Sequence, residues 1–233
     1  MIDFHSHILP EMDDGSSSAS ESLKMLKLSW KMGVDIMVAT PHYYAKDESI
    51  ERFIERRQEK YDLLMREIDG ESEIPQIVLG SEVAFFVGMS RENDISKLCI
   101  NGTRYLLIEM PFAEWSSLTI KEVNGLITNR GIIPIIAHLE RFYPIQCRNG
   151  KIKELLDLDV LVEVNSEAFN GGSLARKMMK MLSKNEIHLL GSDCHNMGEN
   201  PPNLDFAFKL ISNRLGESQL KKIDARGRSI LKG

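Results

Sequence analysis

Cysteine is scarce in this chain: three occur among 233 residues, an odd number at scattered positions. That excludes a disulfide framework and predicts a reducing compartment, the cytoplasm. No apolar run approaches ~18 residues, so we expect no membrane insertion. The N-terminus lacks a basic segment followed by an apolar stretch, so no signal peptide is expected. The net charge of −5, without a basic stripe, disfavours a nucleic-acid partner.

Several catalytic motifs are also missing. No cysteine is followed by five residues and an arginine, the arrangement of cysteine-dependent tyrosine phosphatases; Cys99 precedes Arg104 with only four residues between them. There is no phosphate-binding loop of the P-loop type and no G-x-S-x-G sequence. These absences leave the chemistry to other side chains.

Apolar strand-like runs alternate with helical patterns about seven times along the chain. This order favours a parallel α/β fold, and seven units in 233 residues fit a distorted (β/α)7 barrel. A doubly wound sheet would gather ligand residues from few strands, at one switch point. No domain boundary is visible, so we expect a single domain over residues 1–233. The runs expected as strands are 1–4, 34–40, 77–81, 105–108, 132–137, 160–164 and 187–192.

Helix starts follow from capping signals. Ser18 with Glu21 predicts a capping box, and Thr119 with Glu122 predicts a second one. Helical spacing covers roughly 47–69, and further helices are expected at 149–157, 173–185 and 203–216. The helix at 47–69 fits either outer packing or an assembly surface, so the oligomeric state stays open.

Nearly every strand-like run ends at a residue that can bind a metal. In a parallel barrel the carboxyl ends of the strands form one rim, where active sites lie. Eight candidate ligands follow strands, and Asp14 lies in the first strand-to-helix loop. The eight are His5, His7, His42, Glu82, Glu109, His138, Asp193 and His195.

Two of these exits hold ligand pairs at a spacing of two. In His5-Ser6-His7 and Asp193-Cys194-His195, strand alternation points the outer residues to one side and turns Ser6 and Cys194 away. A lone histidine at such an exit is more often structural, but five of the six histidines lie at exits. His188 is early in its strand, so we expect packing or a backbone hydrogen bond there.

Nine ligands are too many for one ion. Imidazole with carboxylate suits Zn, Mn or Fe, and the lack of an ordered cysteine set argues against a structural zinc. Three divalent ions with the four carboxylates and neutral histidines would leave a site charge of about +2. Such a site attracts a compact anion, of which phosphate is the obvious example, and clustered metals promote its hydrolysis.

The set of motifs resembles the polymerase-and-histidinol-phosphatase (PHP) family, most closely its bacterial branch of manganese-dependent protein-tyrosine phosphatases from capsule and exopolysaccharide loci. The stretches that carry the resemblance span nearly the whole chain in the order of the family. They are residues 1–8, Asp13-Asp14-Gly15, Thr40-Pro41-His42, Gly80-Ser81-Glu82, Ile108-Glu109, residues 136–141, Val164-Asn165-Ser166, and residues 192–196 with Pro201-Pro202.

The resemblance implies a distorted (β/α)7 barrel with three divalent ions, Mn²⁺ by similarity, although Fe or Zn would also fit. It assigns the first ion to His5, His7, Glu82 and Asp193, the second to Glu82, Glu109 and His138, and the third to Asp14, His42 and His195. Arg141 would bind the phosphate. The general acid stays open between a water ligand and His42. The substrate implied is the phosphotyrosine tail of a membrane-associated bacterial tyrosine kinase.

One position departs from that branch. An arginine that also binds phosphate usually precedes the Pro-Pro pair, and here the residue is Asn200. This leaves Asn200 as a weaker candidate for substrate binding and slightly favours an alternative, a small-molecule phosphatase of the histidinol-phosphate kind. A catalytically silent metal-binding module is a third hypothesis, which the complete ligand set opposes.

Overall fold

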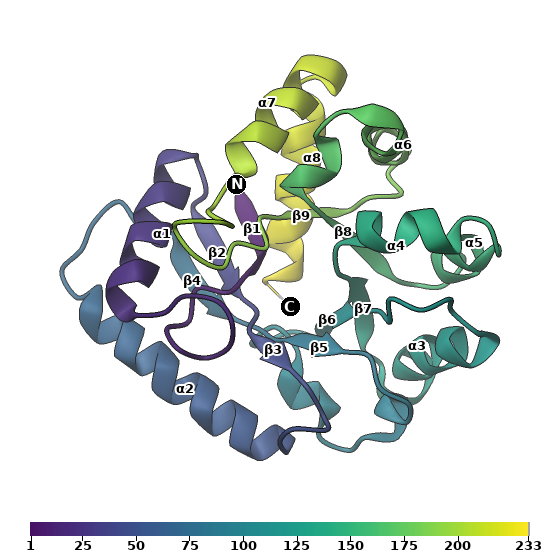
Figure 1. Ribbon diagram of the computed structural model, residues 1–233, viewed down its shortest axis with the longest axis horizontal. Coiled ribbons are helices and arrows are strands. Elements are labelled where there is room, and N and C mark those ends of the chain that lie inside the picture. The colour runs from purple at the N-terminus through teal and green to yellow at the C-terminus, as the bar shows by residue number, and fades with distance from the viewer. Residues whose placement is uncertain (233) are drawn as a thin grey trace.

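Strands and helices alternate along the chain, with the strands in the middle of the molecule and the helices around them (Figure 1). The computed structural model describes residues 1–232. The strands are β1 (Ile2–Ser6), β2 (Ile36–Ala39), β3 (His42–Tyr43), β4 (Gln76–Leu79), β5 (Glu82–Ala84), β6 (Tyr105–Glu109), β7 (Ile133–Ile136), β8 (Leu161–Asn165) and β9 (Leu189–Gly191).

The helices form the outer layer in Figure 1. They are α1 (Ala19–Lys31), α2 (Ile50–Glu67), α3 (Ser117–Arg130), α4 (Leu139–Gln146), α5 (Lys151–Leu156), α6 (Gly172–Ser183), α7 (Leu204–Leu215) and α8 (Glu217–Ile230). Three short 3₁₀ helices accompany them: η1 (Met89–Arg91), η2 (Ile95–Leu98) and η3 (Ser166–Phe169).

All strand pairs are parallel, and the sheet curls. The order is β1-β2-β4 in one part and β3-β5-β6-β7-β8-β9 in the other. Between β2 and β3 lies Pro41, which has no N–H to donate to a ladder. At the other end, His7 N–H donates to the Cys194 carbonyl (2.9 Å) and Asp193 N–H to the His5 carbonyl (2.8 Å), which brings the end of β9 beside β1. The predicted parallel α/β architecture is confirmed; the count of seven units stays a prediction.

Two apolar clusters pack against the sheet. In a parallel ladder, residues in register face the same side, and Glu82, Leu107 and Ile135 are in register across β5, β6 and β7. Leu107 and Ile135 belong to the smaller cluster, which also contains Ile230 of α8. The Glu82 carboxylate therefore sits on a face whose next residues are apolar, so its charge needs partners.

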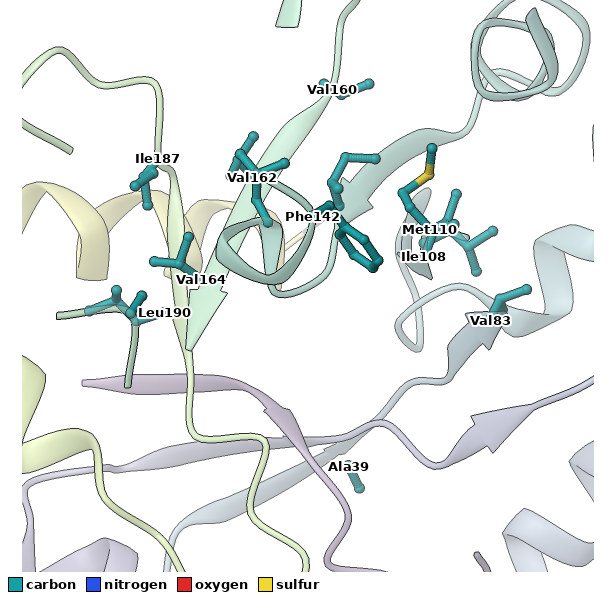
Figure 2. Packing of buried hydrophobic residues seen from close by; sticks show 14 of the residues in the cluster. Ala39, Val83, Ile108, Met110, Phe142, Val160, Val162, Val164, Ile187 and Leu190 are labelled. Atoms are coloured by element: carbon teal, nitrogen blue, oxygen red, sulfur yellow. The ribbon is translucent and has the colours of Figure 1, made fainter. Parts of the chain in front are cut away.

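The larger cluster joins the sheet to the outer helices. Figure 2 shows Val162 and Val164 of β8 with Phe142 of α4 and Ile108 of β6 in this cluster. All four side chains are fully buried. Burying one such side chain contributes about 1.5–3 kcal/mol, so this packing fixes the strand ends relative to one another.

The capping predictions succeed only in part. Ser18 caps α1 by accepting from Glu21 N–H (3.2 Å), but the Glu21 carboxylate accepts from Ser17, so the box is not closed. The second box was predicted wrongly, because the cap of α3 is Ser116 and its reciprocal partner is Thr119. Glu122 instead accepts a hydrogen bond from Ser90 N–H, 3.2 Å away.

Four predicted helical ranges are confirmed within a few residues, as α2, α5, α6 and α7. Two helices were not predicted, α4 and α8. In α8 the close approach of Gly227 to Phe4 explains a glycine in a helix interior, because a Cβ there would lie 2.6 Å from the Phe4 ring. Among residues 1–232, every helix is too short or too polar to cross a bilayer.

Candidate metal centre

The fold brings all nine predicted ligands to one place, the carboxyl ends of the strands. Their ligand atoms form overlapping groups within 4.8 Å of one another: His5, His7 and Asp193; His42, Glu82 and Glu109; and His7, Asp14, His42 and His195. His138 joins the second group, since its Nε2 lies 2.9 Å from Glu82 Oε1 and 3.6 Å from Glu109 Oε1. These groups share His7 and His42, so they form one continuous centre.

Two of the candidate ligands have an uncommon backbone conformation. His138 (φ 33°) and Asp193 (φ 52°) lie in the left-handed region without being glycine. Such residues cost of order 1 kcal/mol or more and persist where the surrounding structure holds them, often at functional sites. At His138 the support is visible: its N–H donates to Glu163 Oε2 at 2.8 Å.

His5 of β1 and His7, just after β1, turn their Nε2 atoms toward each other, 3.2 Å apart. On the far side of each ring a carboxylate faces Nδ1: Asp13 Oδ2 lies 2.8 Å from that of His7, and Glu163 Oε2 lies 3.4 Å from that of His5. A carboxylate at Nδ1 favours the tautomer that leaves an Nε2 lone pair, the usual arrangement around a metal-bound imidazole. Both lone pairs then point at one shared space.

Glu82 lies at the middle of the centre, and its contacts indicate whether a metal ion fits there. Its Oε2 is 2.9 Å from His42 Nδ1, 3.1 Å from His5 Nε2 and 3.3 Å from His7 Nε2. Yet this buried oxygen makes no hydrogen bond, because none of these nitrogens has a suitable direction. Buried polar atoms are rarely left without a partner. A carboxylate oxygen ringed by imidazoles without hydrogen bonds fits a metal ligand.

The electrostatics of the metal-free centre favour charged groups of both signs. Burial alone would lower the pKa of His5, but the negative charges of Glu82 and Asp193 raise it well above its ordinary value. Burial would likewise raise the pKa of Glu82, and the neighbouring histidines lower it well below. Cations therefore offset these carboxylates, either as protons on the imidazoles or as metal ions that displace them.

Three supporting residues were not predicted from the sequence: Asp13, Glu163 and Asn165. Besides His7, Asp13 accepts from His42 N–H (2.8 Å), and the Asn165 amide donates to Asp193 Oδ2 (3.0 Å). Glu163 has a signal in the sequence, since it is a carboxylate inside the apolar run 160–164. Asp13 differs from its neighbour Asp14 only in the geometry of the loop, which the sequence does not give.

Arg141 reaches the rim of the centre from the first turn of α4. Its guanidinium lies 2.5 Å from Asp193 Oδ2, and its side chain is 40% exposed, so it can also contact a ligand from solvent. Asn200, in the loop after β9, is engaged differently. Its amide nitrogen donates to the Asp193 carbonyl at 2.6 Å and lies 3.2 Å from His195 Nδ1.

The expectations for the remaining residues hold. The Ser6 hydroxyl donates to the Val38 carbonyl, and Cys194 is a buried member of the larger apolar cluster. His188 Nδ1 accepts a backbone hydrogen bond from Val162 N–H (3.0 Å), as predicted for a structural histidine. Beside the centre, a cavity of about 330 Å³ is lined by Asp14, His42 and Tyr44 among others.

A parallel α/β sheet with five imidazoles and four carboxylates gathered at its carboxyl edge defines this chain as an α/β protein with a candidate metal centre. The family model described as "Capsular polysaccharide synthesis, CpsB/CapC" matches residues 1–231, and the chain belongs to this family. The resemblance to the capsule branch noted in the sequence is thereby confirmed.

Relatives span almost the whole chain. Tyrosine-protein phosphatase CpsB of Streptococcus agalactiae is 28% identical over 234 residues, which cover 96% of this chain and 94% of the relative. The putative tyrosine-protein phosphatase CapC of Staphylococcus aureus is 33% identical, covering 91% and 82%. A structure from a study of YwqE of Bacillus subtilis and CpsB of Streptococcus pneumoniae, described as metal-dependent tyrosine phosphatases, aligns with a TM-score of 0.86 and 25% identity, covering 100% and 94%.

Proposed function

We propose that this protein is a metal-dependent phosphomonoesterase that hydrolyses phosphotyrosine in a protein substrate. The observation that carries the proposal is the buried centre around Glu82, whose Oε2 lacks a hydrogen bond although three imidazoles surround it. The exposed Arg141 guanidinium at the rim adds a site for an anion. The names of the relatives and of the structural neighbour support the same activity.

Three divalent ions are proposed; the resemblance implies Mn²⁺, and Fe or Zn is compatible with the same donors. The proposed ligand sets are His5, His7, Glu82 and Asp193; Glu82, Glu109 and His138; and Asp14, His42 and His195. The overlapping groups support these sets, with two refinements: His7 also faces the third set, and His42 also faces the second. Glu82 contacts both the first and the second set, so it is the proposed bridge.

When bound, such ions supply an activated water and offset charge on the phosphoryl oxygens. Arg141 binds a phosphoryl oxygen through its guanidinium, and the ion pair with Asp193 orients that guanidinium. Asp13 and Glu163 hold the His7 and His5 rings in the tautomer that leaves Nε2 free. The tyrosine leaving group has a pKa near 10, so it needs only modest help from an acid.

His42 is the proposed proton donor among the residues of the chain, in addition to its place in the third ligand set. Its side chain is partly exposed, and in the metal-free centre its pKa is raised from its ordinary value because the nearby Glu82 carboxylate outweighs the effect of burial. If His42 protonates the leaving group, the loss caused by His42→Ala grows as the pKa of the leaving group rises. A loss independent of the leaving group assigns His42 to ion binding alone.

The biological setting follows from the family. We propose a cytoplasmic enzyme of one domain, residues 1–233, built as a distorted (β/α)7 barrel in which β2 with β3 and β4 with β5 are interrupted strands. Its substrate is the phosphotyrosine tail of a membrane-associated bacterial tyrosine kinase that controls capsule or exopolysaccharide synthesis. The description of the matching family supports this setting.

A small-molecule phosphatase of the histidinol-phosphate kind is the second candidate, and Asn200 favours it. Where the capsule branch has an arginine, this chain has an amide whose nitrogen is already bonded to the Asp193 carbonyl. Among residues 1–232, Arg141 is the arginine that pairs with Asp193, so it is the proposed phosphate-binding guanidinium. Substrate preference therefore decides between the two candidates.

The test compares three substrates: a phosphotyrosine peptide, histidinol phosphate and p-nitrophenyl phosphate. We expect the peptide to have the highest kcat/KM, chelator to abolish turnover, and Mn²⁺ to restore it. Arg141→Ala should lower kcat/KM about 10–150-fold, the range for loss of one charge-assisted hydrogen bond. Arg66→Ala, on the exposed side of α2, is the matched control. Full activity in metal-free protein refutes the proposal, and a preference for histidinol phosphate selects the second candidate.

A further inference from the structure

A groove of about 330 Å³ lies between α6 and α7, two helices that appear near each other at the top of Figure 1. Its apolar lining comes from Phe169 at the end of η3, Met179 of α6, and Phe206 and Leu210 of α7. Phe206 is 39% exposed. The groove therefore offers an apolar surface that the fold does not cover.

Two glycines keep one end of the groove open. Gly171 (φ 73°) and Gly172 (φ 77°) are in the left-handed region, and a Cβ at either position would meet no atom within 4 Å. At these positions the wall is bare backbone, so a peptide can approach it closely.

Two arginines, Arg176 of α6 and Arg214 of α7, also line the groove. Both are exposed, and within residues 1–232 neither forms an ion pair with an acidic side chain. Among residues 1–232, the arginines that do form ion pairs are Arg56 with Glu48, Arg141 with Asp193 and Arg228 with Asp35. Two unpaired positive charges beside an apolar surface complement a ligand that is both anionic and apolar.

A short stretch of the chain connects the metal centre to the groove. Asn165, at the end of β8, donates to Asp193, and the next four residues form η3, which ends at Phe169 in the groove. Ser166 Oγ also donates to the carbonyl of Asn203, the residue just before α7 (2.8 Å).

We propose that this groove binds the segment flanking the phosphotyrosine in the protein substrate, and that this segment carries acidic residues beside an apolar one. Carboxylates would pair with Arg176 and Arg214 while the apolar side chain packs on Phe206 and Leu210. The inference rests on the function proposed above, because it names the substrate segment that the same centre would process.

The key variant is the double charge reversal Arg176→Glu with Arg214→Glu. Its matched control is Lys221→Glu with Lys222→Glu, which makes the same charge change on the exposed part of α8. The substrates are phosphotyrosine peptides with Glu and Leu on the N-terminal or the C-terminal side, the same peptides with Gln or Lys in place of Glu, and p-nitrophenyl phosphate.

For the preferred acidic peptide we expect the groove variant to raise KM about 5–30-fold, the range for two exposed ion pairs of up to ~1 kcal/mol each. Its kcat, and its turnover of p-nitrophenyl phosphate, should match the wild type. The Lys-containing peptide should bind the charge-reversed variant more tightly than it binds the wild type. Phe206→Ala should weaken the acidic and the Gln peptides alike, since it removes the apolar contact.

Binding of the unphosphorylated acidic peptide, followed by fluorescence anisotropy, separates this inference from the proposed function. If the wild type binds this peptide more tightly than the groove variant does, the peptide-binding role of the groove is supported even if the protein does not hydrolyse phosphotyrosine. Equal affinity in the wild type, the groove variant and the control overturns the inference. It is also overturned if the wild type sediments as an oligomer that the groove variant dissociates, because a second copy then occupies the groove.

Discussion

Gly191, the last residue of β9, is a position where one added methyl group should damage the metal centre. A Cβ there would lie 2.5 Å from His5 Cβ and 2.5 Å from Glu163 Oε1. The His5 Cβ cannot swing away, because it is attached directly to the backbone of β1. Gly191→Ala must therefore displace β1 or push the Glu163 carboxylate out of place.

The size of the effect follows from what is lost. Overpacking a filled interior costs about 1–3 kcal/mol. Moving Glu163 also breaks its hydrogen bond from His138 N–H, worth about 1.5–3 kcal/mol for a charged acceptor. We expect the free energy of unfolding to fall by about 2.5–6 kcal/mol if both effects add. Because Glu163 also faces His5 Nδ1, metal affinity should fall roughly 10–100-fold, as for other losses of a ligand's supporting contact.

Urea unfolding and metal titration of purified protein measure both effects. The matched control is Gly198→Ala, also a Gly-to-Ala change in this part of the chain, where the Cβ would be 3.5 Å from Asn196 Oδ1, an ordinary contact. The control should change stability by less than about 0.5 kcal/mol. If Gly191→Ala binds metal and unfolds like the control, Glu163 does not support the centre in the way that the geometry indicates.

Three further predictions test other parts of the centre. Glu82→Ala should lower both metal content and kcat by orders of magnitude, because two ligand sets share this carboxylate; normal stoichiometry by elemental analysis would show that it is not the bridge. Burial raises the pKa of Asp3 from 3.8 to about 6, so above pH 6 the folded protein holds a buried charge that the unfolded chain holds in water. Asp3→Asn should then raise the free energy of unfolding at pH 8 by at most ~3 kcal/mol. The gain should vanish below pH 3.8, where the carboxyl is protonated in both the folded and the unfolded state. Denaturant titrations that give the same gain at pH 8 and below pH 3.8 contradict this reasoning. Asn200→Ala should lower kcat/KM about fivefold by removing a hydrogen bond to the Asp193 carbonyl, and a variant with wild-type kinetics would exclude that role.

The sequence predicts the ligands of the centre well because strand geometry places them. Residues at the ends of parallel strands share one rim whatever the details of packing. His5, Glu82 and His138 each follow an apolar run, so the pattern finds them, and the structure brings them together. Their roles as ligands remain proposals until metal is measured.

The missed helices show where local patterns are insufficient. In α4, Pro144 lies inside the helix, and proline usually argues against a helix interior. Here α4 is held by tertiary packing, since Phe142 is fully buried beside Trp115 and Phe112. In α8, Gly227 weakens the helical pattern for a reason visible only in three dimensions, its contact with Phe4.

Asn200 shows how the structure changes the reading of a single substitution. By sequence it is a phosphate-binding arginine replaced by an amide. In the structure, His195 Nδ1 and the Asn200 amide nitrogen both approach the Asp193 carbonyl, at 2.8 and 2.6 Å. A carbonyl oxygen can accept both hydrogen bonds, and His195 then carries its proton on Nδ1 and keeps an Nε2 lone pair. Asn200 thus makes a contact that fixes the turn between two candidate ligands, Asp193 and His195. Its effect on catalysis should therefore pass through metal geometry, and we expect phosphate recognition to depend on Arg141 instead.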